Sequence, residues 1–584
     1  YDNFFELGGH SLLAMRVIAG IRREMNYRLR IKNFFETPSI AGLAKTILKL
    51  DSSAVLPEIR VNRAPLERIP LSFAQERLWF IDQLGGSREY HISSVLQLEN
   101  NVNKTWLAKA LSLLVDRHQT LRSVIRITEG ETYQEIISSA DWKLQSTELK
   151  ERTSDDHLQA FLQAEINRPF DLANDFMLRA HLVRRGTEEA YLLLVVHHIA
   201  SDGWSQSILV KDFTEIYNAL DAGQVPQLSE IPIQYTDYAI WQRKYMSGKV
   251  LTNQLNWWEE ALQGIEPLRL PTDFSRPAFR STKGAAFVFQ IEPELTQSVK
   301  TLAQRSDVTL FMTLMAVFKI LMYRYSYQQT ICVGTPAANR SYKEIEEIVG
   351  YFINTLVFKS DISGNLSFAA FLESVKTTTL SVFANQEVPF ERIVEKVEKE
   401  RDESRTPVFQ VMFALQNMPA SHALKLGEAN AQHLATEHTT AQYDLTFSAK
   451  ELNDRIVVDV EYSTDLFLDT TAKRMAQHFK NLLKAVVSHP EQNIAQLPML
   501  SPNEERQLLF EFNDTKWDFP KHETVLDLFK QQVLNGGDQV ALLAHDQTLS
   551  YKALHERSNQ LANYLLQQET LSSGLIGICM DRSV

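Results

Sequence analysis

Two adjacent histidines at the end of an apolar run are the residues of this sequence best suited to chemistry. The run, residues 192–196, leads to His197 and His198, and a Ser-Asp-Gly turn follows at residues 201–203. Side chains alternate between the two faces of a strand, so one imidazole can face a substrate while the other packs inward. The same alternation argues against a metal site that uses both rings. A neutral imidazole near pH 7 can accept a proton from an attacking amine, which typically speeds a reaction by about 10²–10⁴-fold.

The residues after the histidines leave two interpretations open. Asp202 can fold back towards the ring or its backbone, and Gly203 allows another group to approach the backbone closely. These features favour a catalytic role for one of the two histidines. The alternative is structural, because two histidines can also cap a buried strand for packing alone.

Ser11 is a second candidate for chemistry, in the sequence GGHS at residues 8–11. A hydroxyl at the start of a helix lies where backbone N–H groups and the helix dipole favour an anion. A phosphodiester attached to Ser11 would be well placed there. The alternative is again structural, since serine is a preferred residue for capping a helix.

The first element that positions these residues is a small helical unit over residues 1–48. Leu13, Val17 and Ile21 recur every four residues, which lines one helical face. The sequence TPS at residues 37–39 predicts a helix start before residues 40–48. The periodicity then lapses from about residue 50 to 69, as in a linker.

A long α/β region is predicted from about residue 70 to 500. Proline and small polar residues at 271–277 predict a flexible crossing near its middle. After residue 502 the chain turns polar and then resumes an α/β pattern. Short apolar runs predict strands at 190–198, 330–333, 356–359, 455–462 and 540–544. A helical spacing of apolar residues predicts helices at 107–121, 310–325 and 551–567. The apolar stretch at 575–580 is also expected to form regular structure.

Composition excludes several classes of protein. The net charge is -12 over 584 residues, which disfavours general nucleic-acid binding because that role needs a basic excess. Cys332 and Cys579 are the two cysteines, so the sequence offers neither a disulfide framework nor a cysteine metal site, and a reducing cytoplasm is expected. The apolar run before the histidines is far shorter than the ~20 residues of a membrane span, and we expect no membrane segment and no signal peptide. The start at Tyr1 suggests a piece of a longer polypeptide.

Residues 2–12 (DNFFELGGHSL) resemble the phosphopantetheine attachment site of a peptidyl carrier domain. The region from about 70 to 500 resembles a nonribosomal peptide synthetase condensation domain, with one departure, Asn385, where the sixth motif usually begins with histidine. Residues 549–554 (LSYKAL) are similar to an early motif of an adenylation domain. The seven condensation motifs appear in order: 71–80 (LSFAQERLWF), 117–122 (RHQTLR), 197–205 (HHIASDGWS), 235–241 (YTDYAIW), 349–356 (VGYFINTL), 385–391 (NQEVPFE) and 401–410 (RDESRTPVFQ).

The resemblance implies an α/β fold class with two chloramphenicol-acetyltransferase-like lobes. The lobes are preceded by a small all-α carrier bundle, whose first helix is missing, and followed by an α/β fragment. The fragment stops before any glycine-rich phosphate loop, so adenylation activity is not expected. The implied divisions are a partial carrier domain at 1–49, a linker at 50–69, the condensation domain at 70–500 (N-lobe about 70–240, C-lobe about 241–500), a linker at 501–522 and an adenylation fragment at 523–584.

The resemblance also assigns the site. The donor acyl group is carried as a thioester on 4'-phosphopantetheine attached to Ser11, and an acceptor aminoacyl thioester arrives on a downstream carrier domain. Its amine attacks the donor at His198, which either removes a proton or orients the amine. The other implied site residues are His197 and Gly203 at the reaction centre, Asp202 as a structural residue paired with Arg122, and Arg117 as further support. Trp204 and Arg340 either line the site or make contacts within the fold.

The implied partners are a phosphopantetheinyl transferase, the acceptor carrier and the adjacent synthetase domains. The carrier is followed directly by the condensation region, which favours an L-configured donor. Two alternatives share the fold. An epimerisation domain typically continues Val-Ser-Trp after the motif glycine, whereas Trp204 and Ser205 follow here. A non-catalytic docking module tends to have a degraded histidine motif, whereas this one is intact.

Overall fold

The structure is a computed structural model, in which the chain divides into two compact units, Tyr1–Ser501 and Pro502–Val584. Each unit is described by itself below. The described residues are 2–4, 7, 17–18, 20–21, 25, 29, 31–49, 58–62, 67–99, 101–186, 189–340, 342–398, 402–416, 424–434, 439–544, 547–568 and 575–580.

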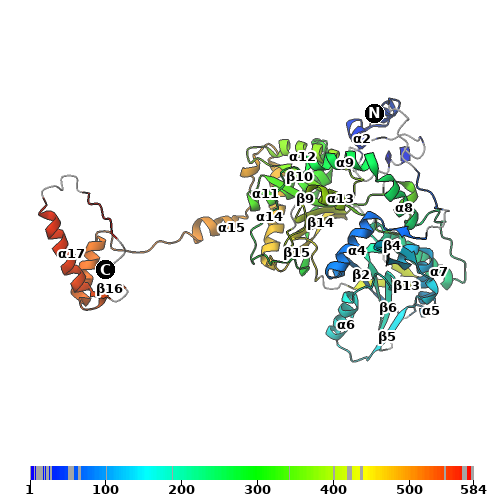
Figure 1. Ribbon diagram of the computed structural model, residues 1–584, viewed down its shortest axis with the longest axis horizontal. Helices are drawn as coiled ribbons and strands as arrows, with labels where there is room; N and C mark the ends of the chain where they lie inside the picture. Colours follow the sequence, from blue (N-terminus) through cyan, green and yellow to red (C-terminus); the bar gives the residue numbers. More distant parts are fainter. Residues whose placement is uncertain are drawn as a thin grey trace. The chain divides into compact units, whose positions relative to one another are not determined.

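The first lobe of the larger unit is built on a six-stranded sheet in the order β12-β13-β2-β7-β6-β5 (Figure 1). The apolar run at residues 192–196 lies in β7, near the middle of this sheet, where both faces are covered. The helices α5 and α7 pack against each other beside it. The elements are β2 (His91–Leu98), α5 (Lys104–Arg117), β5 (Gln145–Leu149), α6 (Asp155–Asn167), β6 (Leu178–Arg185), β7 (Glu189–His197) and α7 (Gly203–Asp221).

A second six-stranded sheet, in the order β10-β9-β11-β14-β15-β8, forms the other lobe. Its strands pair antiparallel, except that β11 runs parallel to both neighbours. Every residue of α11 from Phe311 to Met322 is buried, so this helix is the centre of the larger hydrophobic core. The elements are β8 (Gly284–Ile291), α10 (Pro293–Arg305), α11 (Leu310–Ser326), β9 (Thr330–Ala337), β10 (Asn354–Asp361), α12 (Phe368–Ala384), α13 (Phe390–Val397), β11 (Val411–Gln416), β14 (Leu445–Leu452), β15 (Arg455–Ser463) and α14 (Asp469–Ser488).

The sheet of the first lobe also contains two strands from a later part of the chain. The strands β12 (Leu424–Leu426) and β13 (Ala429–Leu434) follow the second lobe in sequence, yet β13 pairs with β2 of the first sheet through Ala431↔Leu98 to Leu434↔Val95. Without β13, the edge of β2 would present a row of unpaired backbone groups. The first lobe therefore includes residues far beyond the 70–240 that the sequence suggested.

Shorter elements connect the lobes. Tyr235 of α8 donates a hydrogen bond to the carbonyl oxygen of Tyr351 (2.5 Å), and its ring lies so close to Gly350 that a Cβ there would come within 2.0 Å of it. Only glycine fits at that position. The connecting elements are β1 (Ile69–Pro70), α4 (Phe73–Gly85), β3 (Ser123–Thr128), β4 (Glu131–Ile136), α8 (Tyr235–Tyr245) and α9 (Gly248–Ala261).

Several predicted elements are confirmed and one is wrong. β7, β15 and α11 lie within two residues of the predicted bounds. In the small helical unit, Ser39 accepts a hydrogen bond from Gly42 N–H and caps α3 (Ile40–Ile47), as the sequence predicts. Residues 575–580, expected to form regular structure, have no helix or strand. The predicted helix start at Ser11 lies outside the described residues.

No single helix in the described ranges is long and apolar enough to cross a membrane. Only α10 and α11 taken together pass that test, and they are bent by 105°.

The smaller unit, Pro502–Val584, buries little of its apolar surface. Its helices α16 (Val525–Gly536) and α17 (Tyr551–Leu566) flank a hairpin of β16 (Val540–Ala544) and β17 (Gln547–Ser550). Large side chains such as Leu534 and Leu566 are more than three-quarters exposed.

One buried charge-bearing residue stands out in the second lobe. Lys319, in the middle of α11, is fully buried, and its Nζ donates a hydrogen bond to Ser360 Oγ (2.7 Å). Among the described residues it has no carboxylate within ion-pair distance. Burial lowers the pKa of Lys319 to about 7, and Cys332 and Asp361 only partly oppose this. The core therefore holds an amine at a free-energy cost.

We expect Lys319→Met to raise the free energy of unfolding at pH 7.5 by about 2–4 kcal/mol, because it removes that cost. An unfolded lysine keeps an ordinary pKa of 10.5. As the pH falls from about 10 to 7, the unfolded chain therefore binds a proton that the folded chain does not, and the parent protein loses stability. Thermal unfolding of both proteins at pH 7.5 and pH 9.5 tests this, and the difference between them should shrink at the higher pH.

The control is Lys473→Met, which removes an exposed lysine paired with Asp469 and should change stability little. If Lys319→Met melts below the parent at pH 7.5, the buried amine stabilises the core and the expectation is wrong.

Candidate active site

The two histidines lie in different elements at the end of β7. The strand ends at His197, and a 3₁₀ turn, η4 (His198–Ala200), follows before α7 begins at Gly203. His197 is fully buried in the first lobe, whereas His198 is half-buried. The sequence prediction that one ring packs inward and the other turns away is confirmed.

His197 is held by hydrogen bonds to both ring nitrogens. Its Nδ1 accepts from the backbone N–H of Ile199 (3.1 Å), and its Nε2 lies 2.9 Å from Ser87 Oγ. The rings of His91 and Phe170 contact it edge-on at centroid distances of 5.9 and 5.5 Å. Burial lowers the pKa of His197 well below its ordinary value, so the ring is neutral. His197 is thus part of the framework that carries His198.

His198 lies between aromatic rings from the two lobes. Tyr351 of the second lobe contacts it edge-on at 4.9 Å, and Tyr90 of the first lobe lies at 6.4 Å. Burial lowers the pKa of His198, although the Asp202 carboxylate and the carbonyl groups of His198 and Ser201 oppose this. Its Nδ1 is buried without a well-formed hydrogen bond to the described residues. A neutral imidazole with an unsatisfied nitrogen can accept or orient a proton.

The hydrogen bonds of Asp202 run to groups other than the ring of His198. Its carboxylate caps α7 by accepting from the backbone N–H of Ser205 (2.8 Å), and it also accepts from the backbone N–H of Phe352 (3.1 Å). The guanidinium of Arg340 pairs with it at 3.1 Å, and both side chains are almost completely buried. Because these bonds hold the start of α7 and join it to the second lobe, the geometry of Asp202 is that of a bracing residue.

The expected pair between Asp202 and Arg122 is therefore wrong. Arg122 donates instead to the carbonyl oxygens of Ile137 (2.9 Å) and Asp116 (3.3 Å) within the first lobe. The partner is Arg340, which reaches Asp202 from the other lobe across 138 positions of sequence. A half-buried arginine can donate its hydrogen bonds to nearby carbonyl oxygens, whereas the buried carboxylate of Asp202 requires a cation that is buried with it.

Both terminal nitrogens of the Arg340 guanidinium donate hydrogen bonds. Its Nη1 donates to the carbonyl oxygens of Ile345 (2.5 Å) and Ile348 (2.7 Å), and its Nη2 also donates to Ser205 Oγ (2.8 Å). The guanidinium lies 4.1 Å from the ring centroid of Phe352. Burial lowers the pKa of Arg340, and Asp202 opposes this by favouring the cation. Arg340 thus organises the loop before β10.

Trp204 serves the same loop, because its indole N–H donates to the carbonyl oxygen of Glu346 (2.9 Å). The sequence left open whether Trp204 and Arg340 line the site or make fold contacts, and the hydrogen bonds of both lie in the junction between the lobes. Gly203, the first residue of α7, directly follows the Asp202 cap. Backbone N–H groups in the first turn of a helix are free to bind an anion.

Arg117 supports α7 from α5. Its Nε and the Nε2 of His118 both donate to Oδ2 of Asp212, at 2.8 and 3.0 Å. Burial raises the pKa of Asp212, but the hydrogen bonds from His118 and Arg117 lower it by more. This junction fixes the helix whose first turn carries Gly203.

The structure adds residues that the sequence did not single out. Tyr90 and Tyr351 flank His198, and Arg77 lies near enough to influence its charge. Arg77 approaches Glu391 at 3.6 Å, and burial raises the pKa of Glu391 while Arg77 opposes this. Three of the four lie inside motifs that the resemblance already marked. Tyr90 lies in none of them, so no sequence signal pointed to it.

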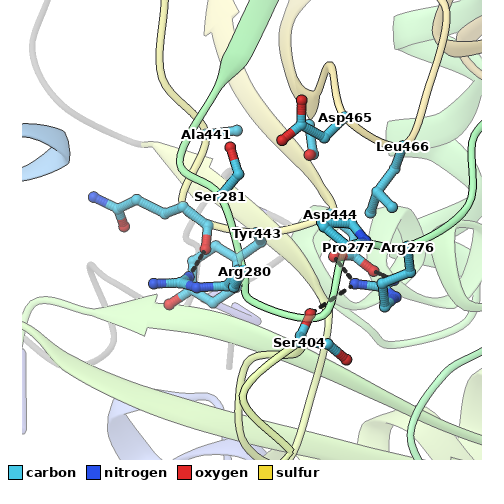
Figure 2. Close-up of a pocket in the computed structure, with 12 residues that line it drawn as sticks. Arg276, Pro277, Arg280, Ser281, Ser404, Ala441, Tyr443, Asp444, Asp465 and Leu466 are labelled. Atoms are coloured by element: carbon cyan, nitrogen blue, oxygen red, sulfur yellow. Dashed lines mark hydrogen bonds and ion pairs between the residues drawn. The ribbon is translucent and has the colours of Figure 1, made fainter. Parts of the chain in front are cut away.

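A small cavity in the second lobe is a packed junction (Figure 2). Arg276 forms an ion pair with the Asp444 carboxylate, and Arg280 donates to the carbonyl oxygen of Gln442 (2.6 Å). The free volume is about 10 Å³, about the space of one water molecule. The segment at 271–277, expected to be a flexible crossing, is irregular but is fastened here by Arg276. No substrate can bind in this cavity.

In the small helical unit, Phe4 packs edge-on against Phe34 at 5.0 Å, and its N–H donates to the carbonyl oxygen of Pro38 (2.7 Å). These contacts hold Phe4 against the unit's core. Ser11 itself lies outside the described residues.

Comparison with known families identifies the class of protein. A condensation-domain model matches residues 66–509, and a phosphopantetheine attachment site model matches residues 2–47. The chain therefore belongs to the condensation-domain family of nonribosomal peptide synthetases, amide-forming acyltransferases of α/β fold, with a carrier segment for covalent 4'-phosphopantetheine. The resemblance and the fold class expected from the sequence are confirmed.

Individual relatives agree. A linear gramicidin synthase of Brevibacillus parabrevis is 41% identical over 595 residues, a match that covers 100% of this chain and 11% of the relative. This chain thus spans about a tenth of the relative's length. The X-domain from teicoplanin biosynthesis superposes with a TM-score of 0.70 at 25% identity, covering 76% of this chain and 100% of that structure. A four-domain nonribosomal peptide synthetase bound to AMP and glycine gives 0.74 at 22% identity, covering 86% and 39%.

Substitutions at the two arginines should separate the pair that the structure shows from the pair that the sequence suggested. Arg340→Ala leaves a buried, unpaired Asp202, so we expect a loss of about 3–5 kcal/mol in the free energy of unfolding, together with loss of amide-forming activity. Arg122→Ala removes two bonds to carbonyls and should cost about 1 kcal/mol. Thermal unfolding of both variants measures the difference.

Arg340→Lys serves as the matched variant, because it keeps a charge but cannot reach Asp202 and two carbonyl oxygens together. It should fall between Arg340→Ala and the parent. A larger effect for Arg122→Ala than for Arg340→Ala would contradict the assignment.

Proposed function

We propose that this chain forms a peptide bond between two thioester substrates at His198. The acceptor amine nitrogen attacks the carbonyl carbon of the donor thioester, the new C–N bond forms, the C–S bond breaks, and the thiol leaves with a proton. The observation that carries the proposal is the placement of His198 between the lobes as a neutral, half-buried ring beside Tyr90 and Tyr351. Such a ring can serve the amine directly.

The residues around His198 support the step in different ways. A neutral imidazole can take the amine proton, or it can orient the amine and stabilise the charged intermediate, and the geometry supports both roles. The N-terminus of α7 lies next to η4 in sequence, and its positive dipole end and the N–H of Gly203 favour the negative charge that develops on the thioester oxygen. Asp202 braces this helix start.

The substrates and partners follow from the same proposal. The donor is bound to 4'-phosphopantetheine on Ser11, which supplies a thioester on a long flexible arm. The acceptor arrives on a downstream carrier domain, and a phosphopantetheinyl transferase modifies Ser11. Residues 523–584 belong to an adenylation domain, and the protein works in the reducing cytoplasm beside other synthetase domains. An L-configured donor is favoured because the carrier precedes the condensation domain directly.

An epimerisation domain and a non-catalytic docking module are the two alternatives. Both would share this fold. The intact series from His197 to Gly203, with Trp204 and Ser205 after it, supports condensation over either.

Replacement of His198 tests the proposal directly. With donor loaded on the carrier and acceptor supplied as a soluble thioester, we expect His198→Ala to form product about 10²–10⁴-fold more slowly than the parent. Product is measured by mass spectrometry. The control is His157→Ala, an exposed histidine on α6, which should retain the parent rate.

The pH profile adds a second reading. Because burial lowers the pKa of His198 below its ordinary 6.5, the ring stays neutral at pH 7, and the parent rate should decline only as the pH drops below 6.5. Equal rates for His198→Ala and the parent would overturn the assignment. A D-configured donor formed without acceptor would favour the epimerisation alternative.

Modification of Ser11 is tested separately. Treatment with coenzyme A and a phosphopantetheinyl transferase should add one phosphopantetheine arm to the parent and none to Ser11→Ala, as read by intact mass. Ser52→Ala, nearby in sequence but outside the motif, should be modified like the parent. An arm that persists in Ser11→Ala would show that the attachment site is elsewhere.

A further inference from the structure

A chain of three side chains runs behind the catalytic turn. The helix α4 ends at Gly85, and Gly86 turns the chain back with a left-handed φ of 93°. Ser87 then lies under His197, with its Oγ 2.9 Å from Nε2 and 2.6 Å from Oδ1 of Asp82. Ser87 and His197 are both buried, so water does not compete for the bond between them, whereas Asp82 is half-buried.

The direction of each hydrogen bond follows from the donors and acceptors. The backbone N–H of Ile199 can only donate, so Nδ1 of His197, 3.1 Å away, carries no proton. A neutral ring then has its single proton on Nε2, which donates to Ser87 Oγ. The hydroxyl proton of Ser87 remains, and it points to the Asp82 carboxylate, which can only accept. The three bonds are mutually consistent in this one arrangement.

This arrangement decides how the turn η4 is held. Nδ1 of His197 caps that turn, whose first residue is His198. In the other tautomer, Nδ1–H and the N–H of Ile199 would face each other as two donors, and Nε2 would have to accept from Ser87. The turn would lose its cap, and Asp82 would lose its donor.

The same segment also reaches the front of the site. The backbone N–H of Tyr90 donates to the carbonyl oxygen of Ser87 (3.0 Å), which folds residues 88–90 into a tight turn. Tyr90 thereby lies beside the ring of His198. Ser87 is thus bonded both to His197, which caps the catalytic turn, and to Tyr90, whose ring lies near His198.

We propose that Ser87 and Asp82 are positioning residues for peptide-bond formation, which hold His197 as its Nε2–H tautomer so that His197 in turn aims His198. This rests on the proposed role of His198. Their effect is on the alignment of the reacting groups rather than on substrate binding, because their side-chain bonds run to each other and to the buried His197.

Steady-state kinetics of the full chain test the proposal. Ser87→Ala should lower kcat about 10–100-fold, by analogy with the loss seen when a partner that orients a metal-bound histidine is removed, while KM for the acceptor stays within about 3-fold. Ser87→Thr keeps a hydroxyl and should restore kcat to within about 3-fold of the parent. Asp82→Ala should lower kcat less than Ser87→Ala, because water can accept the Ser87 proton.

The matched control is Ser139→Ala, which removes an exposed Ser–Asp hydrogen bond of the same 2.6 Å length in the same lobe and should leave kcat unchanged. If Ser87→Ala keeps the parent kcat, or if Ser87→Thr loses as much as Ser87→Ala, the proposal is overturned.

A spectroscopic reading of the parent does not depend on how any variant at Ser87 folds or on activity. In protein labelled with ¹⁵N-histidine, His197 should show a protonated Nε2 and an unprotonated Nδ1 at pH 7, with its signals identified by their loss in His197→Gln. A protonated Nδ1 would overturn the inference even if condensation proceeds. A protein with the expected tautomer that forms no peptide bond would instead count against the proposed function alone.

Discussion

The buried ion pair between Asp202 and Arg340 is the interaction on which the rest of the site depends. It joins the N-terminus of α7 in one lobe to the loop before β10 in the other. Both charges are removed from water, which costs several kcal/mol per ion unless each finds hydrogen bonds. Here the carboxylate accepts from two backbone N–H groups, and the guanidinium donates to two carbonyl oxygens. The pair is stable only when both lobes supply these groups together.

The position of the reacting ring follows from that requirement. His198 contacts Tyr90 of the first lobe and Tyr351 of the second, and Tyr351 directly precedes Phe352, whose N–H binds Asp202. A shift of one lobe against the other would break the ion pair and move an aromatic neighbour of the ring at the same time. The fold thus makes the alignment of His198 a consequence of the same bonds that hold the lobes together.

From the sequence, contacts between neighbouring residues of this site could be predicted better than contacts between residues far apart in the chain. The alternation at His197 and His198 and the placement of Asp202 before a helix are properties of a few neighbouring residues, and both were predictable. The partner of Asp202 was not, because two arginines of the second motif were as plausible as one 138 positions away. The pairing of β13 with β2 could not be predicted either. The pattern of apolar residues in a strand indicates which face is buried but not which strand lies beside it. Tyr90 belongs to no motif, and only the structure shows that it lies near His198.

The two histidines show how one environment produces two functions. Burial lowers the pKa of both rings, so neither carries a charge near pH 7. For His197 both nitrogens are bonded, and neutrality fixes a single tautomer that a framework can use. For His198, Nδ1 is buried without a well-formed bond, whereas the ring as a whole is half-buried, and neutrality leaves its exposed part able to accept a proton. Adjacent residues with the same side chain therefore differ in chemistry through their hydrogen bonds, and the turn that begins at His198 creates that difference.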